Sequence, residues 1–239
     1  MSVLVLIRHA QASFLKPDYD KLSSLGEAQS RLLGEYWARH RIVFDRAYTG
    51  PRVRQKETVA LIVDAYRKAG IKFPEPLVLQ EFDEYQGEAV LERCLPGLLE
   101  TDQTIRDLHA GFQSSSGSAE RRSTFQKLFE AVIGKWVRGE ICPPGVETWL
   151  EFCSRVNSGL TKCLSDGSRG ERIAIFTSGG PIAVVMQRAL QLSAERALSV
   201  SWMSRNSSWS EFIYSGERFT LSSFNCHAHI DDPAMLTYR

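Results

Sequence analysis

Short apolar runs alternate with longer segments in which apolar residues recur at helical spacing. The apolar runs predict four strands, at residues 3–7, 43–48, 77–79 and Arg172–Thr177. The first and last runs are almost entirely apolar, which is typical of strands covered on both faces in a parallel sheet.

The segments between these runs predict three helices, at residues 25–41, 52–69 and 148–164. Ser24 with Glu27, and Thr148 with Glu151, have the spacing of a capping box at a helix start. Helices that alternate with strands predict an α/β fold: a layered α/β/α sandwich with a mostly parallel central sheet.

Two further regions depart from this alternation. Residues 208–214 and 218–224 flank the sequence "SGER" and predict a hairpin at a sheet edge. Residues 101–145 contain "QSSSGSAE", which predicts a loop, followed by a helix with aromatic and aliphatic residues on one side. We interpret the chain as one domain, 1–239, in which 101–145 is either a cap over a site or a surface helical insertion. The helix face consists of Phe125, Leu128, Phe129, Val132 and Trp136.

Composition narrows the class of protein. The 239 residues carry a formal net charge of +1 and are 43% hydrophobic, which suits a globular protein and favours neither nucleic acid nor a membrane surface as a partner. We expect a cytoplasmic protein, because the N-terminus lacks the pattern of a signal peptide. The five cysteines are odd in number and form no CxxC pair, so reduced thiols are expected and a zinc site is not.

Polar residues gather where the predicted strands end. Arg8 and His9 follow the first strand, and Arg54 lies in the first helical turn after the second. Glu81 and Glu84 follow the third, and a Ser-Gly-Gly turn into a helix follows the fourth. In an α/β sheet the carboxyl ends of parallel strands meet at one edge, where ligands bind.

This set of side chains suits a phosphoryl group. Two guanidinium groups can neutralise its oxygens, and helix N-termini such as the one at Gly179 add N–H donors. A neutral imidazole can attack phosphorus, and a carboxylic acid can protonate the leaving oxygen. Each residue alone is more often an ordinary surface or loop group, so the functional interpretation depends on their joint placement.

The motifs resemble those of the histidine phosphatase superfamily, also called phosphoglycerate mutase-like. "LIRHAQ" resembles the RHG/RHA motif, "LSSLGEAQ" is similar to "LTxxGxxQA", "GPRVRQKETVA" to "SPxxRAxQTA", "LQEFDE" to the "LxE" acid segment, and "TSGGPI" to "SHGGVI". "SFNCHAHI" also resembles a C-terminal pattern of the family.

The resemblance implies a phosphohistidine mechanism that needs no metal or other cofactor. His9 would be the nucleophile, Arg8 and Arg54 would bind the phosphate, and Glu81 would donate the proton. The choice between Glu81 and Glu84 stays open. Gln11 and Ser13 would add polar contacts to the phosphate, or would cap the turn instead.

The chain departs from the family pattern at Ser178, where the second histidine of the family should stand. A serine brings no charge, and losing a charge-assisted contact costs about 1.5–3 kcal/mol, or roughly 10- to 150-fold in rate. Two glycines follow Ser178, so room for the change Ser178→His is expected. His227 and His229 are candidates to fill the vacant position, or they pack elsewhere.

Three functions fit these observations. The first is a metal-independent phosphomonoesterase that acts on a phosphorylated small molecule or a phosphoprotein. The second is a phosphoglycerate mutase-like isomerase, disfavoured because no second arginine set is present for a second phosphate. The third is a degenerate family member that binds a phosphorylated ligand or partner without turnover. Neither the substrate nor the oligomeric state can be deduced from the sequence.

Overall fold

The computed structural model describes the chain except residues 14–19, 166–169, 217 and 239. The described residues form two compact units. One consists of Met1–Glu84 with Arg155–Arg239, and the other is Tyr85–Ser154. The predicted insertion at 101–145 lies inside the second unit, and its role as a cap stays a prediction.

The first unit is built on a mostly parallel six-stranded sheet, as the sequence predicts. Strands β1 and β4 form a parallel pair, and so do β4 and β2. Strand β2 is also parallel to β3. On the other side of β1, strands β5 and β6 are antiparallel and form the predicted hairpin, whose turn includes residue 217 outside the described residues. The strands are β1 (Ser2–Arg8), β2 (Arg46–Thr49), β3 (Pro76–Val78), β4 (Arg172–Thr177), β5 (Trp209–Ser215) and β6 (Arg218–Cys226), in the order β3-β2-β4-β1-β5-β6.

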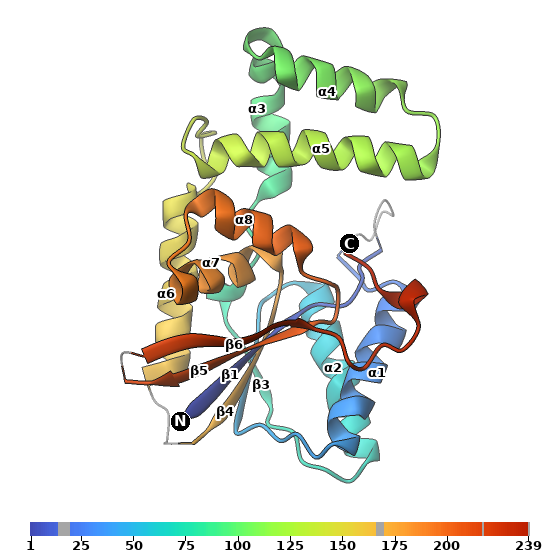
Figure 1. Cartoon of the computed structure of the whole chain (residues 1–239), viewed down its shortest axis with the longest axis vertical. Helices are drawn as coiled ribbons and strands as arrows, with labels where there is room; N and C mark the ends of the chain where they lie inside the picture. Colours follow the sequence, from blue (N-terminus) through green and yellow to red (C-terminus); the bar gives the residue numbers. More distant parts are fainter. Residues whose placement is uncertain (14–19, 166–169, 217, 239) are drawn as a thin grey trace. The chain divides into compact units, whose positions relative to one another are not determined.

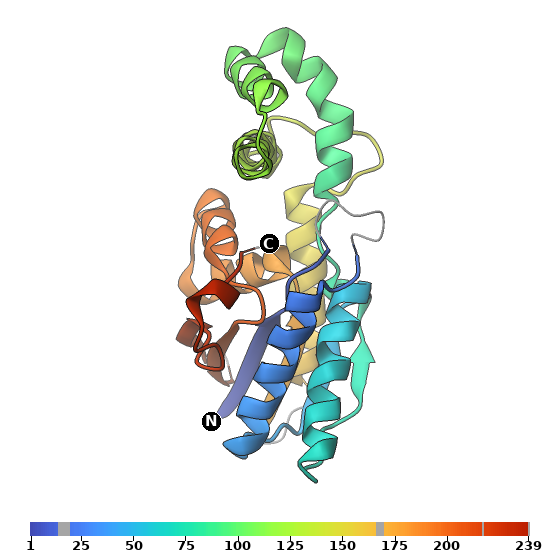
Figure 2. The same cartoon turned by 90° about the vertical axis from the view of Figure 1, so that its right-hand side faces the viewer.

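Helices cover both faces of this sheet (Figure 1, Figure 2). Helices α1 (Ser24–Arg39) and α2 (Val53–Lys68) lie on one side. Helix α7 (Gly179–Leu190) and the C-terminal part of α6 (Trp149–Ser165) lie on the other, with α8 (Ala194–Met203) against α7. The layered α/β/α sandwich is therefore confirmed.

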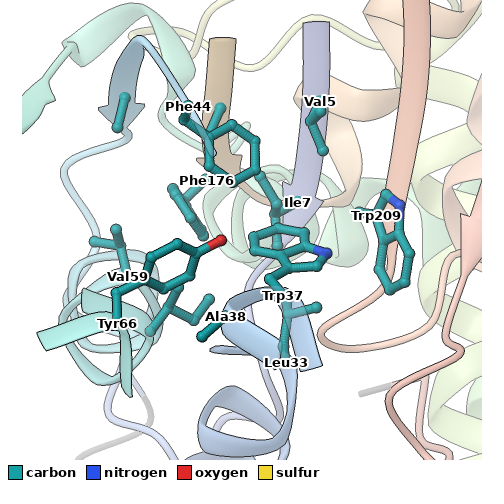
Figure 3. Packing of buried hydrophobic residues seen from close by; sticks show 13 residues of the cluster. Val5, Ile7, Leu33, Trp37, Ala38, Phe44, Val59, Tyr66, Phe176 and Trp209 are labelled. Atoms are coloured by element: carbon teal, nitrogen blue, oxygen red, sulfur yellow. The ribbon is translucent and has the colours of Figure 1, made fainter. Parts of the chain in front are cut away.

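One core cluster joins the sheet to α1 and α2 (Figure 3). Val5 and Ile7 point from β1 to this face, and Leu33 and Trp37 of α1 meet them. Because successive strand residues point to opposite faces, Leu4 and Leu6 are buried on the other face, beneath a second helical layer. Burial on both faces explains the unbroken apolar run that ends at Arg8.

Local capping accounts for the helix boundaries. Helix α1 begins one residue earlier than predicted: the N-cap is Ser23, whose hydroxyl accepts a hydrogen bond from the Gly26 amide. The predicted capping box at α6 is present, since Thr148 and Glu151 exchange hydrogen bonds between side chain and backbone.

The second unit is helical. It contains α3 (Gly87–Thr101), α4 (Gln103–Ser114) and α5 (Ser118–Val137), which pack on one another. Its aromatic core stacks Tyr85 on Trp136 at 5.3 Å between ring centroids. The sequence predicted α5 but neither α3 nor α4, and the predicted loop 113–120 is shorter, because α4 and α5 extend into it.

The described part of the chain has no helix whose length and apolar character would let it span a membrane.

Candidate active site

Four strand ends meet at one edge of the sheet. The His9 amide donates to the Thr177 carbonyl at 2.8 Å, and the Gly50 amide to the Phe176 carbonyl at 2.9 Å. The Leu79 amide donates to the Thr49 carbonyl at 2.9 Å, which adds the third strand end. The segments that carry the predicted site residues therefore lie side by side, as the topology rule requires.

His9 is buried, with 7% of its surface exposed, and both ring nitrogens have partners. Nδ1 lies 2.7 Å from the carbonyl oxygen of Ala10, and Nε2 lies 3.1 Å from Nε of Arg54. A guanidinium nitrogen only donates, so Nε2 accepts and Nδ1 carries the proton that is donated to Ala10. The lone pair of Nε2 thus points toward Arg54, on the side where a phosphate would bind.

Burial lowers the pKa of His9 well below its ordinary value, and the positive charges of Arg54 and Arg8 lower the pKa further. The imidazole is therefore neutral at pH 7. A neutral imidazole is the form that can act as a nucleophile.

The two predicted phosphate-binding arginines are held differently. Arg54 is buried and contacts His9 directly. Arg8 is half-buried, and its guanidinium donates to the carbonyl oxygen of Ser204 at the C-terminal end of α8. Arg8 still acts on the charge state of His9, so both guanidinium groups lie near the imidazole.

Asp20 is a site residue that the sequence did not single out. One of its carboxylate oxygens accepts from Nη1 of Arg54 at 2.8 Å, and the other accepts from the Val53 amide at 2.8 Å. Val53 is the first residue of α2, so this carboxylate sits on both a helix N-terminus and an arginine, which are groups that bind phosphate. No periodic pattern surrounds Asp20, which explains why the sequence did not reveal it.

We expect Asp20→Asn to strengthen the binding of inorganic phosphate. The carboxylate occupies Arg54 and the start of α2, where a phosphate is expected to bind, so removing its charge should relieve competition between the two. The dissociation constant of inorganic phosphate, measured by calorimetry, should fall by up to about tenfold. Asp64→Asn, the same charge change at a partly exposed position of α2, is the control. Unchanged or weaker phosphate binding would show that Asp20 does not compete.

The two candidate acids point to different places. The Glu81 carboxylate pairs with Lys162 of α6, and this pairing lowers the pKa of Glu81. The Glu84 carboxylate instead accepts from the Gly180 amide at 3.1 and 3.2 Å, in the first turn of α7. Glu84, not Glu81, is thus joined to the Ser-Gly-Gly turn of the site.

Ser178 is the N-cap residue of α7 and is fully buried, and Gly179 is the first residue of that helix. The Ser178 hydroxyl oxygen accepts from Nε2 of Gln55 at 2.8 Å. A Cβ on Gly179 would meet only ordinary contacts with Ser201, so close packing does not require a glycine there. Gln55 is the second site neighbour missed by the sequence analysis, although it stands where the quoted family pattern has alanine.

Gln11 and Ser13 are engaged with the start of α1. The Gln11 side-chain oxygen accepts from the Ser23 hydroxyl at 2.7 Å, and the Ser13 hydroxyl donates to the Leu22 carbonyl at 3.1 Å. Gly26 is needed here, because a Cβ at this position would overlap the Gln11 carbonyl. Both side chains are thus hydrogen-bonded within this turn, and their contact with a phosphate stays a prediction.

The two C-terminal histidines are held by other groups. Nε2 of His229 lies 2.8 Å from the Ser207 hydroxyl, and burial lowers the pKa of His229 to about 3. Nδ1 of His227 lies 3.0 Å from the Asn225 carbonyl. Within the described residues, neither histidine has a hydrogen bond to Ser178.

Metal ligands do not cluster in the described residues: no group of three His, Cys, Asp or Glu side chains there could hold an ion. Operation without a metal stays a prediction.

Comparison with known proteins now identifies the family. Residues 88–227 match the model of the histidine phosphatase superfamily, branch 1. The chain belongs to this superfamily. The match spans Ser178 but not His9, Arg8 or Arg54, so it is independent of the motifs around these three residues. No curated protein sequence matches the chain.

Solved structures of several phosphatases and of a phosphoglycerate mutase are similar in fold. A phosphoserine phosphatase from Entamoeba histolytica, in complex with 3-phosphoglyceric acid, has a TM-score of 0.63 at 16% identity, with 96% of this chain and 99% of that chain covered. A mycobacterial glucosyl-3-phosphoglycerate phosphatase with inorganic phosphate has a TM-score of 0.60 at 16% identity, covering 96% and 99%. A phosphoglycerate mutase from Bacillus anthracis has a TM-score of 0.60 at 15% identity, covering 95% and 94%. These likenesses show the fold.

Proposed function

We propose that the protein is a metal-independent phosphomonoester hydrolase that acts through a phosphohistidine at His9. The observation that carries this proposal is the buried, neutral imidazole whose Nε2 lone pair faces Arg54. A structural histidine would not need two arginines beside it, whereas a nucleophile for a phosphoryl dianion does.

The reaction has two steps. Nε2 of His9 attacks phosphorus, and the bond from phosphorus to the ester oxygen breaks while a carboxylic acid protonates that oxygen. A water molecule then attacks the phosphohistidine, its proton passes to the same carboxylate, and the P–N bond breaks to release phosphate. Arg54 transfers its hydrogen bond from Nε2 to a phosphoryl oxygen when substrate binds, which frees the lone pair and neutralises charge.

We assign the acid to Glu84. Its carboxylate is hydrogen-bonded at the start of α7, beside Ser178, whereas the Glu81 carboxylate is paired with Lys162. A bound phosphoryl dianion favours the protonated form of a neighbouring carboxylic acid by like-charge repulsion, which prepares it to donate.

The substrate we propose is a phosphorylated small molecule or a phosphoprotein. The structural neighbours include phosphatases named for phosphoserine and for glucosyl-3-phosphoglycerate, which supports phosphomonoesters as a class. A cytoplasmic location, and the absence of nucleic-acid or membrane partners, remain predictions.

A second candidate is a degenerate member that binds a phosphorylated ligand without turnover. The uncharged Ser178 and the carboxylate of Asp20 on Arg54 favour it, because both weaken the stabilisation of a phosphoryl group.

A panel of phosphomonoesters assayed with excess chelator tests the proposal. We expect release of phosphate from at least one of them, at a rate that the chelator leaves unchanged, with an acid-labile phosphoenzyme trapped on rapid quenching. Turnover that depends on added magnesium or zinc would refute the metal-independent mechanism. Phosphate binding without hydrolysis of any ester would favour the second candidate.

A further inference from the structure

We propose that Gln55 is a positioning residue for phosphoryl transfer, acting through the hydroxyl of Ser178. This inference rests on the proposed function and adds a residue to the same site. In this arrangement the amide of Gln55 holds the Ser178 hydroxyl so that its proton is directed to an oxygen of the transferring phosphoryl group.

The orientation of the Gln55 amide is determined by its surroundings. Its side-chain oxygen accepts from the backbone amide of Arg52, the N-cap residue of α2, at 3.1 Å. Because a backbone N–H only donates, the oxygen must be on this side and Nε2 on the other. Nε2 then donates to Ser178 at 2.8 Å and lies 3.4 Å from the Phe82 carbonyl.

The direction of the hydrogen bond between the two residues follows. The amide nitrogen of Gln55 donates, so the Ser178 oxygen accepts, and its own proton is left for another partner. None of the described residues accepts that proton, and Ser178 is fully buried. A buried hydroxyl without an acceptor is costly, so an acceptor supplied by the substrate is favoured.

Ser178 lies next to the nucleophile. It follows Thr177, whose carbonyl accepts the His9 amide hydrogen bond, so the two residues leave neighbouring parallel strands side by side. A proton donor at this position reaches the same phosphoryl group that Nε2 attacks.

The sizes of the two side chains are matched. The family pattern quoted above has alanine at the position of Gln55 and histidine at the position of Ser178, so the large and small residues are exchanged here. Gln55 is fully buried, and Gly50 makes room for it, because a Cβ at Gly50 would overlap the Gln55 side-chain oxygen. Gln55 thus fills the volume beside Ser178 that an imidazole would need.

This packing changes the expectation for Ser178→His. The two glycines after Ser178 do not provide the space, because the space is taken by Gln55. We therefore expect Ser178→His alone to lower both kcat and the melting temperature. Combined with Gln55→Ala, which vacates the volume, the same histidine should restore kcat at least to the wild-type value.

Steady-state kinetics with the best phosphomonoester of the panel test the inference. Gln55→Met keeps the volume and removes the donor, and Ser178→Ala removes the hydroxyl. Each variant should lower kcat about tenfold with little change in KM. The double variant should lower kcat no more than either single variant, because both changes remove the same chain of hydrogen bonds. Ser30→Ala removes another fully buried serine hydroxyl, which donates within α1, and serves as the control with unchanged kcat.

The possible outcomes are distinguishable. If Gln55→Met keeps the wild-type kcat, Gln55 only fills space. If Ser178→His alone raises kcat, the site already has room for a histidine. Either result overturns the inference and leaves the phosphatase proposal intact. If Gln55→Met fails to fold, Ser178→Ala decides, because it leaves the hydrogen bond between Gln55 and the Arg52 amide in place. A wild-type protein with neither turnover nor a phosphoenzyme would overturn both proposals.

Discussion

His9→Ala is expected to abolish turnover, lowering kcat by about 10⁴-fold or more. The change removes the atom that attacks phosphorus, and no neighbouring group can replace it, since the other contacts of the imidazole are Arg54 and a backbone carbonyl. Phosphate release and rapid-quench trapping of the phosphoenzyme measure the effect. Phosphate should still bind, because Arg8 and Arg54 remain.

The pH dependence of the same step gives an independent check. The pKa of His9 is lowered well below its ordinary value in the folded protein, mainly by burial, which favours the neutral imidazole at pH values where a free histidine is partly protonated. A free histidine would instead lose its nucleophilic form over this range. We therefore expect the formation rate of the phosphoenzyme not to follow a histidine titration near pH 6.5.

His40→Ala is the matched control. His40 is an exposed histidine at the C-terminal end of α1, where its ring contacts the Tyr36 carbonyl, and the start of α1 is the end that faces the site. Its loss should leave kcat unchanged. Substantial turnover in His9→Ala would refute the phosphohistidine mechanism.

Glu84→Gln is expected to lower kcat by about 10²- to 10⁴-fold, the usual contribution of a general acid. Glutamine keeps the shape of the side chain but cannot give a proton to the leaving oxygen. The loss should be largest for alkyl phosphates and much smaller for aryl phosphates whose leaving group needs no protonation. That dependence on the leaving group separates loss of an acid from general damage to the site.

Glu81→Gln is the paired experiment. It breaks an ion pair whose lysine is largely exposed, with 61% of the Lys162 side chain accessible, so its effect on stability should be within about 1 kcal/mol. We expect kcat to change by no more than about twofold. A larger loss in Glu81→Gln than in Glu84→Gln would return the acid role to Glu81, the residue favoured by the motif resemblance.

The part of the fold that local patterns control could be predicted. Strand β4 has the predicted bounds, because its run of apolar residues is buried on both faces and ends where Thr177 meets the helix start. Helices α3 and α4 were not predicted, and the loop before α5 is shorter than expected. Both helices pack on α5 within the second unit, and such tertiary packing leaves no signal in the local sequence.

The sequence by itself determined that the carboxyl ends of the parallel strands lie at one edge of the sheet, and therefore that Arg8, His9 and Arg54 share that edge. The strand order came from the structure. Only the tertiary structure decided which partners the other polar side chains near this edge contact. Glu81 and Glu84 are three residues apart, and their carboxylates differ in partner because the short turn Gln80–Phe82 lies between α6 and α7. The contacts of Asp20 with Arg54, and of Gln55 with Ser178, join residues far apart in the chain. No local pattern encodes such pairs, since they depend on the direction in which each side chain leaves its own element.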